Sequence, residues 1–411
     1  MTVLRARVLT PEGPGAVQWF EDAIVVIEGG RITHVGPFDG RSVDEDLRPG
    51  VLTPGFVDAH VHFPQTRIVG AASGPLLEWL AKSTFPEEAR FADPTHAKVV
   101  AKVFAAKLAA SGTTLAFAYG PVFTAASDAL LTEFARTGQR AIVGPVLMDA
   151  NCPSELMVPR EPAIEALDAL ADKWHGHEDR LFVAAIPRFA LSCSAEIMRA
   201  GAELAQRRDL WVSTHLSENR EECRVACEMF RTDDYLRVYE DAGILRSKSL
   251  FAHCIHLSDS EWERFANAGA VVAHCPDSNA FLGSGNMPLA SVLERGIPLT
   301  VGTDVAAGRS FRIARTLSHA YDNALATGRP TLASELLWWG TRGGAEALGF
   351  ANIGLLAPGY EADLVLWEVP PWAETAEAVL GALLFDGDLP APRATWVGGR
   401  RVYWRAGEAS S

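Results

Sequence analysis

Residues 51–69 read VLTPGFVDAHVHFPQTRIV, and this stretch decides how the rest of the chain is interpreted. Two short apolar runs flank a Pro-Gly pair, and the second run ends in DAHVH before another proline. The pattern is typical of a buried β-strand that ends in polar residues. Side chains alternate along a strand, so His60 and His62 are expected on one face with Cα atoms about 6.6 Å apart. Two imidazoles at this spacing can bind one metal ion. An isolated His-x-His pair more often lies on a solvated edge strand without a metal, so a metal site requires further ligands downstream in the sequence.

The composition favours a small ligand and a reducing compartment. The 411 residues include 37 Lys and Arg against 51 Asp and Glu, a net charge of −14, which argues against binding a nucleic acid. Six cysteines without any Cys-x-x-Cys are too few for a disulfide framework. The first residues lack a signal peptide, and no apolar run approaches the roughly 18 residues of a membrane span. We therefore expect a cytoplasmic protein with no membrane contact.

In the central part of the chain, short apolar segments alternate with longer segments whose apolar residues recur with the period of an α-helix. Examples of the longer segments are 94–111 and 122–136. Continuous apolar strands separated by helices are typical of a parallel sheet buried on both faces. Eight such strands are predicted, at 51–62, 113–119, 140–148, 181–189, 210–218, 249–257, 270–279 and 298–305. Eight βα units predict an α/β fold, a (β/α)8 TIM-type barrel whose active site lies at the C-terminal ends of its strands.

Both chain ends have a different pattern, with alternating apolar and polar residues. Segments 23–36 and 394–404 each fold back through a Gly-Gly pair, as in a β-hairpin. We therefore predict three parts: residues 1–53 and 352–411 together form a composite β-sandwich domain, and residues 54–351 form the barrel. The acidic and proline-rich stretch 370–392 is interpreted as a surface excursion.

Polar residues interrupt the predicted strands only at their C-terminal ends. A barrel brings such positions together, so His60, His62, His215 and Asp304 are predicted to bind one divalent ion. A single histidine at the end of a strand more often has a structural role, as a hydrogen-bonded residue. Three histidines and one aspartate, all at the functional ends of their strands, are hard to obtain by chance. Three nitrogens and one carboxylate suit Zn²⁺, with Fe²⁺ as the alternative.

The proton carriers are predicted to be Glu218 and Asp304. Glu218 follows strand five, where it can reach a metal-activated water; the alternative is an acid at the N-terminus of the next helix. His253 could hold a second metal, contact the reacting water or brace the ligands. Because strand four offers Arg188 in place of a lysine that could bridge two metals, we predict one metal, with His253 contacting the water. His274 and Asn279 are interpreted as bracing residues.

The motifs PGFVDAHVH, THLSE, AHC and GTD resemble those of the amidohydrolase superfamily, metal-dependent hydrolases with a (β/α)8 barrel and a composite β domain. More narrowly, the chain resembles the guanine deaminases along nearly its whole length. The motifs that carry this likeness are HFPQ at 62–65, LLEWL and TFP within 76–86, PRFALSCS at 187–194, THLSEN at 214–219, AHCPDSN at 273–279 and GTDVAAG at 302–308.

The resemblance implies a homodimer that hydrolyses guanine to xanthine and ammonia with one zinc ion per subunit. It implies zinc ligands at His60, His62, His215 and Asp304, a proton shuttle at Glu218 and purine contacts from Gln65, Arg188 and Phe189. The family usually has a tyrosine where this chain has Ser83, which affects the pocket wall or a dimer contact.

The residue types support a purine pocket without the family likeness. The planar fork of Arg188 can donate to the O6 and N7 acceptors of guanine, whereas adenine presents an amino group at position 6. Phe189 and Trp79 offer aromatic faces for a base. The alternatives are an ion pair at the barrel rim for Arg188 and core packing for the two aromatic residues.

The expected mechanism is attack of a metal-activated water on C2 of guanine, with Glu218 protonating N3 and Asp304 relaying a proton to the departing amine. Competing hypotheses are a formiminoglutamate deiminase, a pterin or triazine deaminase, and a non-catalytic scaffold, although such a scaffold would be expected to lose ligands. The signature of cytidine-type zinc deaminases is absent from the sequence.

Overall fold

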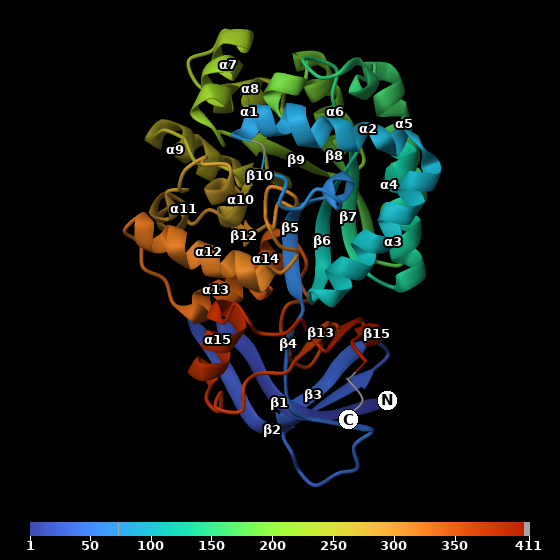
Figure 1. Cartoon of the computed structure of the whole chain (residues 1–411), viewed down its shortest axis with the longest axis vertical. Coiled ribbons are helices and arrows are strands. Elements are labelled where there is room, and N and C mark those ends of the chain that lie inside the picture. The colour runs from blue at the N-terminus through green and yellow to red at the C-terminus, as the bar shows by residue number, and fades with distance from the viewer. Residues whose placement is uncertain (73, 407–411) are drawn as a thin grey trace.

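The computed structural model describes residues 1–72 and 74–406 and contains two sheets (Figure 1). The larger sheet has eight parallel strands that follow one another in sequence order. They are β5 (Phe56–His62), β6 (Thr113–Gly120), β7 (Arg140–Leu147), β8 (Leu181–Pro187), β9 (Trp211–Leu216), β10 (Ser249–His253), β11 (Val271–His274) and β12 (Leu299–Val301). Each lies at a predicted apolar segment, so the expectation of a TIM-type barrel is confirmed.

The segment that follows β12 closes the barrel against β5. The Asp304 N–H donates to the His60 carbonyl at 2.8 Å, and the His62 N–H donates to the Val305 carbonyl at 3.1 Å. The buried Asp58 carboxylate accepts from the backbone N–H and the hydroxyl of Thr303, at 3.0 and 2.6 Å. These bonds place Asp304 directly beside the two histidines of β5.

An irregularity in β5 turns its histidines into the barrel. Val57 and Ala59 pack with interior residues such as Phe117, whereas Val61 packs in the outer cluster. Simple alternation would keep all three on one face. The register with β6 shifts between residues 58 and 61, and a local irregularity of this kind re-aims the side chains that follow it. His60 and His62 therefore point inward, for a reason that alternation alone does not provide.

Helices pack around the barrel between its strands. They include α3 (Pro94–Ala110), α4 (Thr124–Thr137), α5 (Arg160–Trp174), α6 (Ala195–Arg207), α7 (Arg220–Phe230), α8 (Tyr235–Asp241), α9 (Asp259–Ala268), α10 (Pro276–Phe281), α11 (Leu289–Glu294), α12 (Ile313–Ala326), α13 (Ala333–Gly340) and α14 (Arg342–Ala347). The Asp93 carboxylate caps α3 by accepting from the Thr95 N–H. Within the described ranges, no helix is both long and apolar enough to span a membrane.

A short helical segment follows β5 and lies at the same end of the barrel as α7 (Figure 1). It consists of α1 (Leu76–Trp79), a π-helical turn η2 (Leu80–Thr84) and α2 (Phe85–Ala89). Single π-turns often occur at functional sites because they re-aim the side chains around them.

The second sheet combines strands from both chain ends, as predicted. Its order is β15-β14-β13-β4-β1-β2-β3, and β13 pairs antiparallel with β4. The strands are β1 (Thr2–Gly13), β2 (Ala16–Glu28), β3 (Arg31–Pro37), β4 (Glu45–Pro54), β13 (Leu364–Trp367), β14 (Ala394–Val397) and β15 (Arg400–Trp404). The sheet curls until its two Gly-Gly turns meet: a Cβ added at Gly30 would lie 2.9 Å from the Gly398 carbonyl. Only glycine fits this approach.

The prediction of a surface excursion at 370–392 is wrong for its middle part. Residues Ala376–Phe385 form helix α15, and the hydroxyl of Thr375 caps it by accepting from the Ala378 N–H. Leu380 and Leu383 are buried in the largest hydrophobic cluster. The acidic and proline-rich flanks obscured the apolar stretch between them.

Candidate active site

One pocket at the C-terminal end of the barrel contains most of the predicted functional residues. Its lining combines histidine and carboxylate side chains with aromatic and polar side chains that suit a flat ligand. The predicted residues that line it are His62, Gln65, Trp79, Arg188, Phe189, His215, Glu218, His253 and Asp304. His60 is fully buried and reaches the same centre through its contacts with His62 and Asp304.

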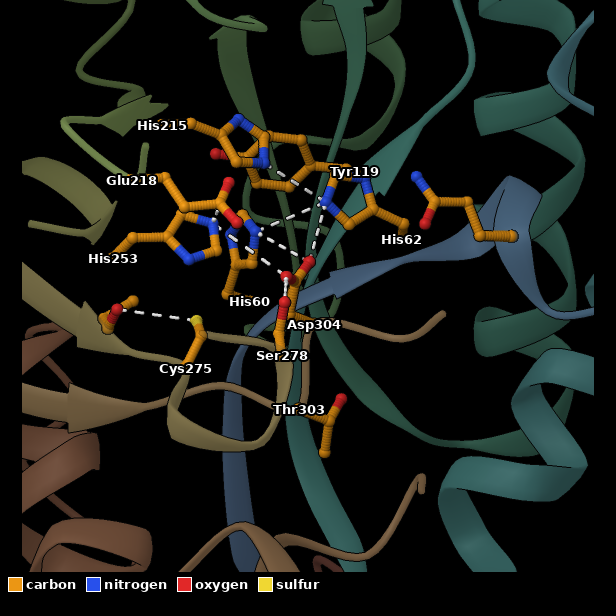
Figure 2. A network of polar contacts seen from close by, with 12 residues as sticks. His60, His62, Tyr119, His215, Glu218, His253, Cys275, Ser278, Thr303 and Asp304 are labelled. Atoms are coloured by element: carbon orange, nitrogen blue, oxygen red, sulfur yellow. Dashed lines mark hydrogen bonds and ion pairs between the residues drawn. The ribbon is translucent and has the colours of Figure 1, made fainter. Parts of the chain in front are cut away.

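Four side chains converge at the base of this pocket (Figure 2). One ligand atom from each of His60, His62, His215 and Asp304 lies within 4.8 Å of all the others. His62 Nε2 is 3.3 Å from Nε2 of His60 and of His215, and Asp304 Oδ1 is 3.3 and 3.2 Å from Nε2 of His60 and His62. A tetrahedral ion with ligand bonds of about 2.0 to 2.1 Å needs its ligand atoms about 3.3 to 3.4 Å apart. The donors present therefore fit one small divalent cation.

Neighbouring groups orient these ligands. The Nδ1 of His215 lies 2.6 Å from the Arg188 carbonyl, which can only accept, so Nδ1 carries the proton and Nε2 faces the centre. The hydroxyl of Ser278 donates to Asp304 Oδ2 at 2.5 Å, which leaves Oδ1 for the centre. The ring of Tyr119 packs against the histidine rings, and its hydroxyl is 2.7 Å from Ser213 Oγ.

The protonation states also suit a metal centre. Burial lowers the pKa of His60 to about 4 and the pKa of His215 well below its usual range, so both rings are neutral at pH 7. Burial alone would raise the pKa of Asp304, but its interactions with the His60, His62 and His253 rings together outweigh burial and hold that pKa well below its ordinary value. Neutral imidazole and ionised carboxylate are the forms that bind cations.

Glu218 faces the pocket just beyond β9. The Ser284 hydroxyl donates to its Oε1 at 2.9 Å, and its Oε2 lies 3.5 Å from His253 Nε2. Burial raises the pKa of Glu218 to about 7, which suits a group that exchanges protons at neutral pH. The alternative role at the start of α7 is filled by Glu222, whose carboxylate accepts from the backbone N–H groups of Glu218 and Asn219.

His253 lies between the two pocket carboxylates. Its Nδ1 is 2.8 Å from Asn279 Oδ1, so Nδ1 donates and Nε2 faces Glu218 and Asp304. The nitrogen Nε2 is buried and makes no hydrogen bond to the described residues. This arrangement leaves Nε2 between Glu218 and Asp304 in the pocket lining. His274 is buried outside the pocket lining, and neither of its ring nitrogens has a partner in the described part of the chain.

The same pocket contains the predicted purine contacts. Arg188 Nη1 donates to Glu88 Oε2 at 2.6 Å, and Gln65 Nε2 donates to Glu88 Oε1 at 3.2 Å. The Phe189 ring is almost fully buried in the wall, and the Trp79 indole N–H is held by the Ala71 carbonyl at 2.9 Å. Arg188 thus forms an ion pair, as one sequence interpretation allowed, and also faces the pocket.

Sequence reasoning did not identify four of the supporting residues, Asp58, Glu88, Ser278 and Ser284. Ser278 and Asp58 lie inside quoted motifs, so adjacency to a predicted ligand was an available signal. Glu88 lies in the helical run FPEEA, where an acidic pair usually marks a solvated helix start. Nothing in the local pattern distinguishes it from Glu87.

The chain is similar to known proteins in both sequence and fold. The model of the amidohydrolase family matches residues 51–402. A curated relative from Deinococcus radiodurans, named probable guanine deaminase, is 38% identical and is aligned over 100% of both chains. The solved guanine deaminase of C. acetobutylicum with bound guanine is 27% identical, with a TM-score of 0.92 over 98% of this chain and 100% of that one. A zinc-bound adenosine deaminase from Xanthomonas campestris is 25% identical, with a TM-score of 0.85 over 97% of this chain and 92% of that one.

Proposed function

The chain belongs to the amidohydrolase family, and we propose that it is a guanine deaminase, which hydrolyses guanine to xanthine and ammonia. The observation that carries this proposal is the content of one pocket. The pocket brings a four-donor metal group and Glu218 together with Arg188 and Gln65. The solved relative with guanine in its active site supports the same ligand.

We propose that His60, His62, His215 and Asp304 hold a single Zn²⁺ ion. Three imidazoles and one carboxylate with no thiolate suit zinc, with Fe²⁺ as the alternative, and zinc is bound in the related adenosine deaminase. When bound, such an ion lowers the pKa of a water molecule and makes it a nucleophile at neutral pH.

Substrate recognition is assigned to Arg188, Gln65, Phe189 and Trp79. The Arg188 guanidinium can donate to O6 and N7 of guanine, and the amino group of adenine would face these donors unfavourably. Phe189 and Trp79 provide aromatic faces for the base, and Gln65 contributes a further polar contact. C2 and N3 lie on the opposite edge of the purine from O6 and N7, and we propose that this edge faces Glu218 and the metal group.

Proton transfer is assigned to the buried acids. Glu218, whose pKa is raised to about 7, delivers a proton to N3 while the water attacks C2. Asp304 accepts a proton from the attacking water and passes it to the departing amine, and His253 Nε2, 3.9 Å from Asp304 Oδ2, contacts that water. Ser284 and Asn279 hold Glu218 and His253 in place for these steps.

We further propose a cytoplasmic homodimer that acts in purine breakdown, with the three-part division at residues 1–53, 54–351 and 352–411. Light scattering on the purified protein tests the dimer directly. A mass of one chain, 44.3 kDa, would contradict it.

The activity is tested by substrate profiling. We expect loss of the guanine ultraviolet band with formation of xanthine and one equivalent of ammonia, and no ammonia from N-formimino-L-glutamate, pterins or triazines. Turnover of one of those compounds, with guanine unchanged, would contradict the proposed substrate and favour the corresponding deaminase.

A further inference from the structure

Glu88 in helix α2 bridges Arg188 and Gln65, the two polar residues among the predicted purine contacts. It is fully buried, and each of its carboxylate oxygens accepts one hydrogen bond. Oε2 accepts from Arg188 Nη1 at 2.6 Å, and Oε1 accepts from Gln65 Nε2 at 3.2 Å. Arg188 directly follows β8, and Gln65 lies in the turn after β5. The Glu88 side chain therefore joins two parts of the barrel rim that are far apart in the sequence.

The amide of Gln65 is fixed in one orientation by two contacts of opposite polarity. The Ala306 N–H donates to Gln65 Oε1 at 3.0 Å, and Glu88 accepts from Gln65 Nε2. A flipped amide would place N–H against N–H at Ala306 and oxygen against carboxylate at Glu88. The Glu88 carboxylate and the Ala306 N–H together decide which end of the amide faces which neighbour.

The guanidinium of Arg188 is held from two directions. Its edge donates to Glu88, and its face lies over the Phe85 ring, 5.5 Å from the ring centre. No other acceptor contacts this guanidinium among residues 1–72 and 74–406, so its remaining N–H groups are available to a ligand. Both partners are almost fully buried, at 3% and 1% exposure, so the pair offers directed donors without a net buried charge.

We propose that Glu88 is a positioning residue for purine recognition, which aims Arg188 and Gln65 so that the pocket selects a 6-oxopurine over a 6-aminopurine. This inference rests on the proposed guanine deaminase activity. Glu88 is not expected to touch the reacting atoms, so its effect should appear in substrate binding and selectivity more than in the chemical step.

The test compares E88Q, the exchange variant Q65E/E88Q and the control E87Q. In E88Q the new amide must direct N–H at either Arg188 or Gln65, both of which are donors. In the exchange variant every donor again faces an acceptor: residue 65 accepts from Ala306 and from residue 88, and residue 88 accepts from Arg188. Glu87 is the neighbouring acid of α2 and pairs instead with Arg67, Arg90 and His96.

We expect E88Q to raise KM for guanine by roughly 10- to 100-fold, the effect of one charge-assisted hydrogen bond, with a smaller change in kcat. The ratio of kcat/KM for guanine over 2,6-diaminopurine should fall, and bound metal per chain should remain at the parent value. The exchange variant should recover part of the KM, and E87Q should match the parent.

Two results would overturn the inference, and they are distinguishable. If the parent enzyme releases ammonia from guanine but E88Q keeps the parent KM and selectivity, Glu88 has only a structural role. A lower melting temperature with unchanged KM in the folded fraction would lead to the same conclusion. If the parent itself does not convert guanine, the proposed function fails and this inference fails with it.

Discussion

Glu218 and Asp304 are both buried carboxylates in one pocket, yet their surroundings move their pKa values in opposite directions. Burial raises the pKa of Glu218 to about 7, whereas for Asp304 the interactions with the His60, His62 and His253 rings outweigh burial and hold the pKa well below its usual range. Two acids with separated pKa values can take different roles at one pH. Glu218 can carry a proton at pH 7, and Asp304 stays ionised beside the metal group.

The variant E218Q tests this division of roles. The amide keeps the shape of the side chain and its hydrogen bond from Ser284, but it cannot exchange a proton. We expect kcat for ammonia release from guanine to fall by about 10²- to 10⁴-fold. Bound metal should stay at the parent amount because Glu218 is not among the four converging ligands. Ammonia release near the parent rate would remove Glu218 from the mechanism.

His274 provides a pH-dependent contribution to stability. Burial lowers its pKa to about 3, so the folded protein keeps this ring neutral where the unfolded chain, with a pKa of about 6.5, becomes protonated. Stability is therefore complete above pH of about 6.5 and falls as the pH decreases toward about 3. The contribution changes by up to about 1.4 kcal/mol per pH unit in this range.

We expect H274N to unfold in urea with a weaker dependence on pH than the parent between pH of about 6.5 and about 5. The matched control is H34N, because His34 is exposed on β3. Equal slopes of unfolding free energy against pH for the parent and H274N would show that His274 does not titrate differently in the two states.

Single residues differ in how well the sequence predicts them. The metal group could be predicted because barrel strands place their C-terminal residues together whatever their separation in the chain. Glu88 could not be predicted, because its burial depends on how α2 packs across the rim. Glu218 was open to two readings until the structure showed Glu222 at the helix start.

At the scale of elements, β5 and α15 show what periodicity does not contain. Alternation along β5 predicted that His60 and His62 share a face, but the inward direction comes from the register shift between residues 58 and 61. Helix α15 was not predicted, because the acidic and proline-rich residues on both sides of it made the whole stretch 370–392 resemble a surface loop. In the structure its apolar residues pack against the barrel helices. The strand positions could be predicted because short, continuous apolar segments between helices are typical of strands in a buried parallel sheet.

Helix α15 should contribute measurably to stability. We expect L383A to lower the free energy of unfolding by about 2 to 5 kcal/mol, because it leaves a cavity in the main cluster. The exposed residue Glu377 on the same helix supplies the control, and E377A should stay within about 0.5 kcal/mol of the parent. Urea unfolding gives both values. A loss in L383A no larger than that of the control would mean that α15 does not contribute to the core.

At the scale of the whole molecule, the barrel and the curled sheet are joined by a buried ion pair. Arg140 begins β7, Asp363 directly precedes β13, and their side chains pair at 2% and 1% exposure. Asp363 also accepts from the Gly398 N–H at 2.8 Å. Because removal of Arg140 leaves the buried Asp363 charge without its cationic partner, this contact should couple the stability of the two sheets.

We expect R140M to lower the free energy of unfolding by about 3 to 5 kcal/mol and R140M/D363N to recover part of that loss. D363N removes the unpaired charge while keeping an acceptor for Gly398. The exposed pair of Arg41 and Asp39 supplies the control, and R41M should change stability by no more than about 1 kcal/mol. If the double variant is as unstable as R140M plus a separate D363N loss, the two side chains act independently.

The central claim is that His60, His62, His215 and Asp304 hold one catalytic cation. The most direct measurement is titration of chelator-treated protein with Zn²⁺ while the conversion of guanine to xanthine is followed. We predict no turnover without metal and a linear rise that ends at one equivalent of Zn²⁺ per chain. Full activity in the chelator-treated protein, or a rise that continues to two equivalents, would contradict the single-metal account.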